Sequence, residues 1–424
     1  MNNILKKILP GDNIAVEGMA WNVISFGIIG ASGILMNLII GIKGKELLGA
    51  FNQVMAVYIV LAQIGALGLQ NSSIHYIAKY RDDAEMKNTI FSTHFIISFL
   101  MGSVVAGILH LIAPFLGKYV FKSDMVYNGL CAIIPAIVFF SVNKVLLGLV
   151  NGLRQMKAYA ILQAMRYIAI IFSVTTVLLF FDNKALIMYS FLFAEFLVFV
   201  CCLPVLLRNL KFGKIKLDFL KESTSMGIRF MAGGIIGELN TKMDIIVLGY
   251  FCTDAIVGVY SMASVLAEGF FSLLGVFKTN LNPLFAQFAV NEEYMELNRL
   301  ISEMKKKIVK LSCVGAICIL GVLVVICFIA GEEYLSALFP LSIILLCMVI
   351  ASPAIVMGNL LGQKGKPELD TYITLAMVTL NVILNILLIP RLEMVGAALA
   401  TGGSYLLLKV FQYHFIKKYI ICHN

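Results

Sequence analysis

The sequence is 424 residues long; 60% of the residues are hydrophobic and only 13% are charged. A soluble domain carries about 25% charged residues, so this chain cannot cover a soluble surface. Its apolar residues come in runs of about 20, the length of a helix that crosses a bilayer, and the alternating strands of a membrane barrel do not appear. The predicted fold class is therefore an all-α polytopic membrane protein.

Charge and motifs exclude several other functions. The net charge of +9 is interpreted as a signal for membrane orientation and not as a nucleic-acid-binding surface. The nine cysteines show no metal-ligand spacing, and no Gly-rich phosphate loop ends in Lys-Ser or Lys-Thr. No loop is long enough for an enzymatic domain. The sequence therefore predicts no enzyme, metal or cofactor, although a coupling ion such as H⁺ or Na⁺ stays open, and the remaining chemistry is transport.

In chain order, residues 1–17 are predicted to be a short cytosolic lead-in without a cleaved signal peptide. Twelve membrane spans follow, at 18–42, 49–75, 89–113, 124–150, 158–181, 185–207, 223–250, 256–285, 307–330, 335–360, 370–389 and 395–416. Most Lys and Arg residues between the spans lie on the side of the N-terminus, so both termini are predicted to be cytosolic.

Two Gly-rich markers indicate an internal repeat. Gly49-Ala-Phe-Asn begins the second span, and Gly258-Val-Tyr-Ser begins the eighth. Gly148 and Gly152 end the fourth span, as Gly358 and Gly362 end the tenth. The similar offsets predict two six-helix lobes, 1–210 and 211–424, related by pseudo-two-fold symmetry about the membrane normal, with the substrate handled between them. Chance similarity of short Gly-rich segments is the alternative.

A polar stripe follows the eighth span at helical spacing. It consists of Ser261, Ser264, Glu268, Ser272, Gly275, Thr279 and Asn282. Packing through small residues would explain Ser and Gly but not Glu268, so a water-lined face is favoured. The repeat offset relates Ser261, Ser272 and Thr279 to Asn52, Gln63 and Gln70 in the second span, which again share a face. The two spans are therefore predicted to face each other across a central cavity.

Further ionisable residues lie inside the predicted spans, where charge is costly. In the seventh span Arg229, Asn240 and Asp244 share one face, whereas Glu238 and Lys242 lie opposite as a possible self-neutralising pair or as cavity residues. Lys278 lies deep in the eighth span. Lys144, Arg166, Arg229 and Lys409 are close enough to predicted cytosolic ends to snorkel to the interface. For Glu195, a buried structural role and a functional role fit the sequence equally well.

The candidate cavity residues are Lys278, Lys242, Asp244, Glu268, Arg229, Asn240, Asn52, Gln63, Gln70, Ser261, Ser272 and Thr279. The basic segment 208–222 between the lobes fits two interpretations, an amphipathic linker on the membrane surface or a solvated connector.

Several motifs resemble one family. Asp244-xxx-Leu248-Gly249-x-Phe251 followed by Val257-Gly258-x-Tyr260 resembles the start of the second half in polysaccharide flippases. Leu48-Gly49-x-Phe51-Asn52 resembles the matching site of the first half, and Pro390-x5-Gly396-Ala-Ala-Leu-Ala-Thr401 resembles the segment entering the twelfth helix. Together with the Gly148 and Gly358 turns, the resemblance covers nearly the whole chain and points to the multidrug/oligosaccharidyl-lipid/polysaccharide exporter superfamily.

The resemblance implies an O-antigen or related (Wzx-type) flippase of lipopolysaccharide or polysaccharide biosynthesis. Such a protein moves undecaprenyl-pyrophosphate-linked oligosaccharide from the cytosolic to the periplasmic leaflet of the bacterial inner membrane by alternating access between two bundles. It implies that cations, here Lys242 and Lys278, meet the pyrophosphate. A polysaccharide polymerase and chain-length proteins are the partners that it suggests.

Two other functions remain open. One is a cation-coupled multidrug exporter, although such transporters typically use an acidic residue in the first helix, and the predicted span 18–42 has none. The other is a non-transporting scaffold of a polysaccharide assembly complex.

Overall fold

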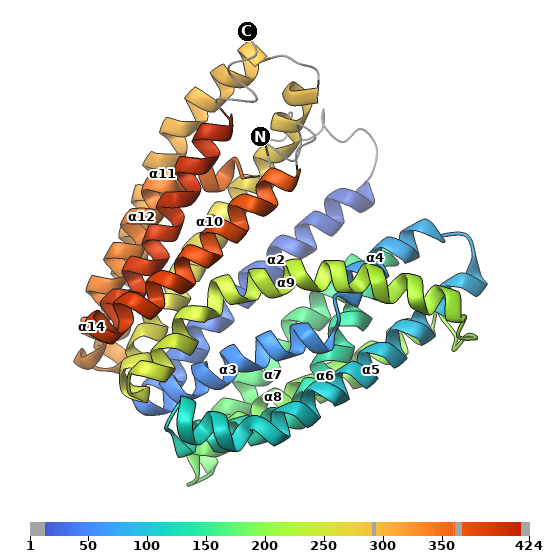
Figure 1. The fold of residues 1–424 in the computed structure, drawn as a ribbon, viewed down its shortest axis with the longest axis horizontal. Helices are drawn as coiled ribbons and strands as arrows, with labels where there is room; N and C mark the ends of the chain where they lie inside the picture. Colours follow the sequence, from blue (N-terminus) through green and yellow to red (C-terminus); the bar gives the residue numbers. More distant parts are fainter. Residues whose placement is uncertain (1–12, 291–293, 359, 361–366, 417–424) are drawn as a thin grey trace. The chain divides into compact units, whose positions relative to one another are not determined.

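The computed structural model describes residues 13–290, 294–358, 360 and 367–416, and the chain is helical almost throughout (Figure 1). The longer helices are α2 (Asn13–Gly41), α3 (Lys45–Gly65), α4 (Leu69–Lys79), α5 (Ala84–Phe115), α6 (Asp124–Gly152), α7 (Met156–Phe180), α8 (Ser190–Leu207), α9 (Leu217–Phe251), α10 (Asp254–Val290), α11 (Tyr294–Ala330), α12 (Leu338–Val356) and α14 (Pro367–Ile416). Short π- or 3₁₀-helical turns, η1 (Leu116–Val120), η2 (Lys184–Tyr189) and η3 (Glu332–Ala337), join some of them.

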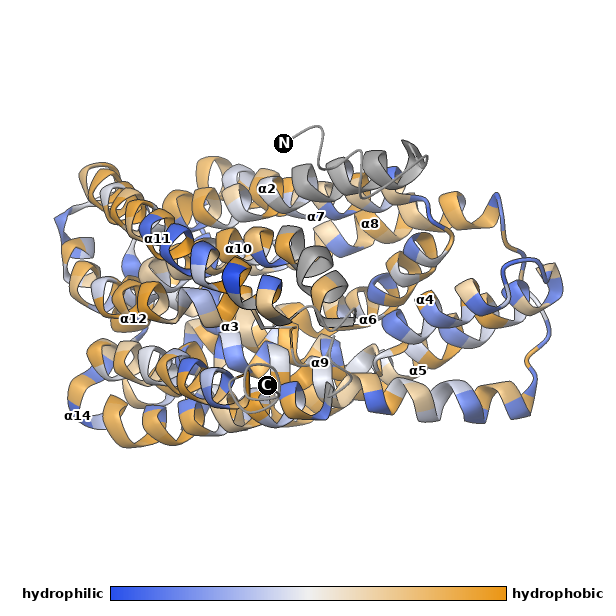
Figure 2. Cartoon of the chain, turned by 90° about the horizontal axis from the view of Figure 1, so that it is seen from above, coloured by the Kyte–Doolittle hydropathy of each residue, from blue (hydrophilic) through white to orange (hydrophobic). Residues whose placement is uncertain are grey.

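Each of the twelve predicted spans overlaps a helix, which confirms the all-α membrane class. In the described part of the chain, nine helices are long and apolar enough to cross a membrane, and hydrophobic residues dominate their length in Figure 2. The last of these, α14, contains two spans, because Glu393 leaves the helical conformation (φ 48°, ψ −128°) just after Pro390. The kink lies where the sequence predicts the junction of the eleventh and twelfth spans.

The second predicted span is not one straight helix. It is divided into α3 and α4, because Leu67 and Gly68 both adopt positive φ (51° and 67°). A Cβ atom on Gly68 would lie 2.2 Å from the carbonyl oxygen of Gly227 on α9. Only glycine permits so close a backbone contact in this conformation at low cost. Asn52 and Gln63 therefore lie on α3 and Gln70 lies on α4, so the prediction of one continuous helical face through all three residues is wrong.

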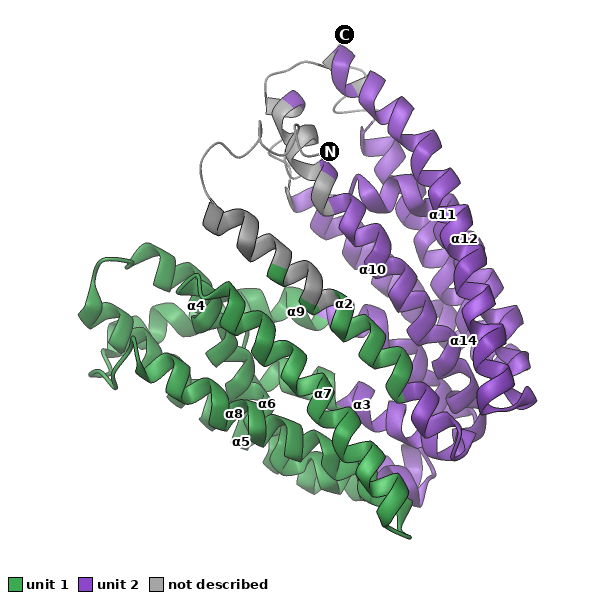
Figure 3. Cartoon of the chain, turned by 180° about the vertical axis from the view of Figure 1, so that it is seen from behind, with its two compact units in different colours: residues 1–36, 58–114, 128–235 green, residues 37–57, 115–127, 236–424 purple. Residues whose placement is uncertain are grey.

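The chain forms two compact units, coloured separately in Figure 3. Unit 1 consists of residues 1–36, 58–114 and 128–235, and unit 2 consists of residues 37–57, 115–127 and 236–424. Two segments of the N-terminal half are thus included in unit 2, and the first part of α9 is included in unit 1. The predicted functional division into lobes 1–210 and 211–424 stays a prediction.

Burial within the units follows the predicted repeat. The fourth and tenth spans correspond to α6 and to α12 with its preceding turn, and the most apolar window of each is 67% buried. The most apolar windows of the third and ninth spans, α5 and α11, are only 33% and 17% buried. In unit 2, α12 packs against α10, α11 and α14 and so forms its centre. In these two pairs, the helices that the repeat relates are thus similar in being mostly buried or mostly exposed.

The two repeat-related glycines Gly49 and Gly258 meet where the first turns of α3 and α10 cross, inside unit 2. A Cβ atom on Gly49 would lie 1.8 Å from the carbonyl oxygen of Asp254, and one on Gly258 would lie 1.9 Å from that of Lys45. The carboxylate of Asp254 accepts hydrogen bonds from Gln53 Nε2 (2.7 Å) and Ser123 Oγ (2.5 Å) beside this crossing. The second and eighth spans thus touch at one end, whereas a central cavity between them stays a prediction.

Two Gly→Ala substitutions, one at this crossing and one away from it, are expected to change the stability of the protein differently. Gly49→Ala should destabilise the protein by more than about 3 kcal/mol, because the new methyl group overlaps backbone that cannot rotate away. Gly107→Ala, on α5 with no heavy atom within 4 Å of the new methyl group, should leave stability unchanged or raise it by up to about 1 kcal/mol. Thermal unfolding of both variants in one detergent checks this; equal melting temperatures would rule out the tight crossing.

Candidate functional site

The centre of the candidate site in unit 2 is the buried carboxylate of Asp244, which is 6% exposed. Tyr260 Oη donates to its Oδ2 atom (2.8 Å), the Thr401 hydroxyl donates to the same oxygen, and Asn385 Nδ2 donates to Oδ1 (2.7 Å). A buried charge is tolerated where several donors replace its water shell. Asp244 therefore sits in a preformed polar site inside an apolar bundle.

Local helix geometry explains how this site is assembled. Asn381 and Asn385 lie one turn apart on the first part of α14, and Asn385 Nδ2 also donates to Asn381 Oδ1 (3.0 Å). The kink at Glu393 reverses the chain, and Gly396 approaches the backbone of Leu388 so closely that a Cβ atom there would lie 2.6 Å from its carbonyl carbon. The hairpin brings Thr401 beside Asn381, with a 3.3 Å hydrogen bond.

The donor set of the Asp244 site determines what it can hold. Carboxylate, amide and hydroxyl oxygens suit a proton or a small hard cation better than a soft transition metal. In the part of the chain that the structure describes, the buried Oδ1 atom of Asn385 has no hydrogen-bond partner, which adds an unused acceptor. Among the described residues, no group of three or more His, Cys, Asp or Glu side chains could hold a metal ion.

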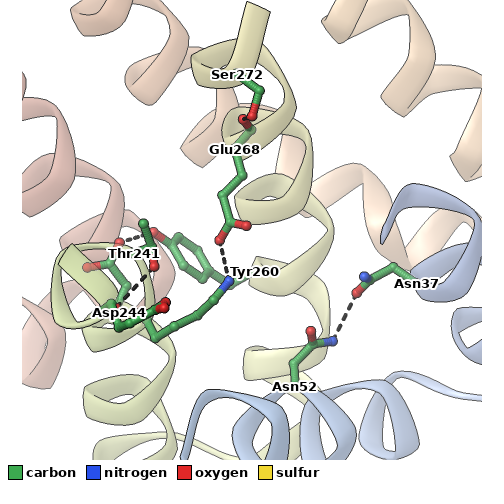
Figure 4. Close-up of polar contacts among 9 residues, drawn as sticks. Asn37, Asn52, Thr241, Asp244, Tyr260, Glu268 and Ser272 are labelled. Atoms are coloured by element: carbon green, nitrogen blue, oxygen red, sulfur yellow. Dashed lines mark hydrogen bonds and ion pairs between the residues drawn. The ribbon is translucent and has the colours of Figure 1, made fainter. Parts of the chain in front are cut away.

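Beside the Asp244 site lies an ion pair between α9 and α10. Lys242 Nζ contacts Glu268 Oε1 at 2.6 Å, and Figure 4 shows Glu268, Asp244 and Tyr260 close together. The Lys242 side chain is 9% exposed, whereas that of Glu268 is 38% exposed. The lysine is thus buried, and its partner reaches an accessible surface. The sequence suggested Glu238 on the same helix as a partner for Lys242; the cross-helix pair with Glu268 could be recognised only in the folded protein.

The predicted stripe on α10 is polar but not uniformly accessible. Ser261 is buried and its hydroxyl donates to the carbonyl oxygen of Val257 (2.7 Å). Ser272 is exposed and donates to that of Glu268 (2.9 Å). Both hydroxyls are therefore satisfied by their own helix, which leaves Glu268 as the charged group of the stripe near the Asp244 site. The side chain of Thr279 lies outside the part of the chain that the structure describes.

Lys278 does not join the Asp244 site. It lies ten residues, nearly three turns, beyond Glu268 on α10 and is half-buried. Its ammonium group would be 3.1 Å from a Cβ atom on Gly358, just past the end of α12, and Asp370 is near enough to attract it. Of the two other α9 candidates, Asn240 is half-buried, and Arg229 is exposed and belongs to unit 1.

Unit 1 contains a different kind of polar site, an ion pair between Arg166 on α7 and Glu195 on α8. Arg166 Nε lies 2.7 Å from Glu195 Oε1, and the two side chains are 8% and 2% exposed. Asn143 on α6 donates to Glu195 Oε2 at 2.8 Å, and the guanidinium lies over the ring of Phe140. The prediction that Arg166 snorkels to the interface is wrong, because a buried carboxylate holds it inside. Glu195 is therefore a buried acid that is paired with Arg166.

Two of the three predicted polar residues of the second span do meet in unit 1. Lys144 Nζ donates to Gln63 Oε1 (2.6 Å), and Gln70 Nε2 donates to the same oxygen at 3.4 Å. Lys144 therefore binds an internal amide, so its predicted snorkelling is also wrong. The third residue, Asn52, belongs to unit 2, where its amide donates to Asn37 Oδ1 at 2.9 Å (Figure 4).

The sequence did not predict a role for His94, because the five histidines are scattered along the chain. In the structure its ring is fully buried on α5 and contacts two hydroxyls, Ser73 Oγ at 2.7 Å and Ser223 Oγ at 2.5 Å. These serines lie on α4 and α9. The histidine thus joins three helices of unit 1.

A sequence profile of the family described as "polysaccharide biosynthesis protein" matches residues 16–289. The chain belongs to this family. Two of its curated relatives are archaeal proteins. An uncharacterized membrane protein of Methanocaldococcus jannaschii is 24% identical over 95% of this chain and 84% of its own length. The probable low-salt glycan biosynthesis flippase Agl15 of Haloferax volcanii is 25% identical over 45% of this chain and 40% of its own.

Solved structures extend the likeness to the whole fold. The lipid II flippase MurJ in its inward closed conformation aligns with a TM-score of 0.77, at 13% identity, over 94% of this chain and 87% of MurJ. An inward-facing multidrug resistance MATE family transporter of the MOP superfamily aligns with a TM-score of 0.76, at 11% identity, over 93% and 96% of the two chains. The polysaccharide biosynthesis protein therefore has the all-α fold of these membrane proteins, in agreement with the fold class that its sequence predicted.

The residues that the sequence reading missed had a weak signal in common. Asn143, Asn381, Asn385 and Thr401 are uncharged polar residues in strongly apolar spans. Asn381 and Asn385 also have the i, i+4 spacing of one helical face. A single amide or hydroxyl in an apolar span is less conspicuous than a charge, although Asn385 and Thr401 supply two of the three hydrogen bonds to Asp244 described above.

The buried pair of unit 1 predicts strong coupling between Arg166 and Glu195. Arg166→Met and Glu195→Met should each destabilise the protein by about 3–5 kcal/mol, because each leaves a buried charged group without its partner. Arg166→Met combined with Glu195→Met should cost clearly less than the sum of the single changes. Unfolding of the variants in detergent provides the comparison, and simple additivity would show that the two side chains do not depend on each other.

Proposed function

We propose that this polysaccharide biosynthesis protein is a flippase that moves a lipid-linked oligosaccharide across its membrane by alternating access. The observation that carries the proposal is the polar site of unit 2. A buried carboxylate and a partly accessible Lys242–Glu268 pair lie within apolar helices of a chain from this family. Intramembrane ionisable groups are costly and mark a pathway for polar cargo. The relative that is named as a probable glycan biosynthesis flippase supports the same cargo class.

The proposed substrate has a polyprenyl tail, a pyrophosphate and a repeat-unit sugar. In the specific form of the proposal, the tail is undecaprenyl and the substrate moves outward from the cytosolic leaflet. Lys242 and Lys278 are the proposed cationic contacts for the pyrophosphate, and the amide and hydroxyl groups of the stripes are proposed contacts for sugar. The proposal further includes that both termini are cytosolic, that the membrane is the bacterial inner membrane and that the sugar is an O-antigen repeat unit. A polymerase and chain-length proteins would be its partners.

The alternative of a cation-coupled drug exporter has one observation in its favour. The predicted first span contains no acid, but the helix α2 begins at Asn13 and thus includes Glu17, whose side chain lies outside the described part. A drug exporter would lose efflux when Glu17→Gln removes this acid. A glycan flippase would keep its glycan phenotype in that variant unless Glu17 serves coupling.

Loss of the protein is expected to stop surface glycan assembly and to accumulate lipid-linked repeat units in the leaflet where they are made. Chromatography of extracted lipid-linked glycan in a clean deletion strain measures this. Collapsing the proton and sodium gradients separately in vesicles would identify the coupling ion. A deletion strain with normal glycan and increased drug sensitivity would favour the exporter, and normal flipping in vesicles without this protein would favour the scaffold.

Lys278→Ala is expected to reduce flipping at least about tenfold, the effect of losing a charge-assisted contact to phosphate, while Lys278→Arg keeps much of the activity. Lys409→Ala is the matched control, because this lysine lies on α14 and is also half-buried. Flipping of a fluorescent lipid-linked oligosaccharide into vesicles measures all three variants. Full activity of Lys278→Ala would remove this residue from the proposed site.

A further inference from the structure

The segment that joins α8 to α9 follows a fixed path over unit 1. The backbone N–H of Lys211 donates to Asn88 Oδ1 and that of Gly213 donates to Ser92 Oγ, both at 2.7 Å, so the segment is bound to α5. A Cβ atom on Gly213 would lie 2.8 Å from the carbonyl carbon of Asn88, so the contact is tight. At its two ends, Leu210 (2% exposed) and Phe219 (5% exposed) are buried. The segment is therefore not a loose solvated connector.

Between these buried ends, the segment presents apolar and basic side chains together. Phe212, Ile215 and Leu217 are 60%, 43% and 72% exposed. The three lysines of the same stretch, Lys211, Lys214 and Lys216, are also exposed. We call these six side chains the linker surface. Residues 210–216 have no helical structure, and from position 214 lysines alternate with apolar residues, so the two kinds of side chain are interleaved along the chain.

Intramolecular contacts do not satisfy the linker surface. Lys216 contacts Glu85 at 3.0 Å, but the two side chains are 47% and 78% exposed. Such a pair is screened by water and salt and contributes about 0–1 kcal/mol, so it does not hold the lysine back from another anion. Phe212 packs on one side against Phe91, with ring centroids 4.9 Å apart, yet most of its surface stays open.

We propose that the linker surface is a binding surface for anionic phospholipid headgroups of the bilayer in which the protein lies. It follows the C-terminal end of α8, a candidate membrane span, so we expect it at the membrane–water interface. An anionic interface provides both components that the surface requires, phosphates for the lysines and the hydrocarbon boundary for Phe212, Ile215 and Leu217. A second copy of the chain fits less well, because the same lysines would face one another.

This surface is separate from the Asp244 site and does not depend on the identity of the cargo. Its expected effect is on unit 1, because the segment is bound through Asn88 and Ser92 to the first turns of α5, and Phe219 packs on Tyr76 of α4. Anionic lipid would thus hold the ends of two helices at the interface.

Tryptophan fluorescence tests the proposal directly. The chain has a single tryptophan, Trp21, so Ile215→Trp in a Trp21→Phe background reports only from the linker surface. The purified protein is reconstituted in vesicles of phosphatidylcholine alone or of phosphatidylcholine with phosphatidylglycerol, each with acyl chains brominated near the headgroup. We expect blue-shifted emission and strong quenching with phosphatidylglycerol, and at least about half of that quenching to be lost in Lys211→Gln/Lys214→Gln, because each lysine adds electrostatic attraction to the surface.

Two controls make the outcome decisive. Lys43→Gln/Lys118→Gln removes the same charge from exposed lysines elsewhere and should leave the quenching unchanged. Soluble inorganic pyrophosphate should not compete, which separates bilayer headgroups from the pyrophosphate of a substrate. Water-like, unquenched emission in both vesicle types would overturn the proposal. So would a signal that depends on protein dilution and not on lipid charge, because that result would indicate contact between copies.

Discussion

The dominant physical constraint on this protein is the cost of placing polar and charged groups among apolar helices. A carboxylate in a low-dielectric interior is tolerated only when a cation or several donors replace water. The described structure meets this condition at Glu195 through Arg166 and Asn143, and at Asp244 through Tyr260, Asn385 and Thr401. These clusters fix which helix faces turn inward, and so they orient the helices that carry them.

The two units satisfy the constraint in different ways. The acid of unit 1 is neutralised by a permanent cation, since arginine keeps its proton. The acid of unit 2 is surrounded by neutral donors, and a nearby lysine is bound to a different, partly accessible acid. An acid that is already neutralised by a fixed ion pair is not expected to exchange ions, whereas an acid surrounded by neutral donors can take up a proton or cation. Unit 2 therefore contains the polar site on which the proposed function rests.

Glycine provides the complementary constraint on close approach. Gly49 and Gly258, one from each sequence half, let α3 and α10 cross with their backbones in contact, and Gly68 allows the break before α4 beside α9. No larger residue fits at these positions. The repeat visible in the sequence therefore has a structural use, because its equivalent glycines meet each other instead of serving two unrelated turns.

The sequence by itself determined the membrane class, the twelve spans and the repeat, because lipid requires long apolar helices and each span is a local property of the chain. It also made Asp244, Lys242 and Glu268 candidates, since a charge in an apolar span is conspicuous without any knowledge of its neighbours. Only the tertiary structure decided the partners. Lys242 binds Glu268 on the next helix, Arg166 binds Glu195 instead of water, and Asn385 reaches Asp244 across 141 residues of sequence. Helical periodicity places a side chain on a face, but the partner depends on packing between helices and on local breaks such as Leu67–Gly68, which a single-helix pattern cannot encode.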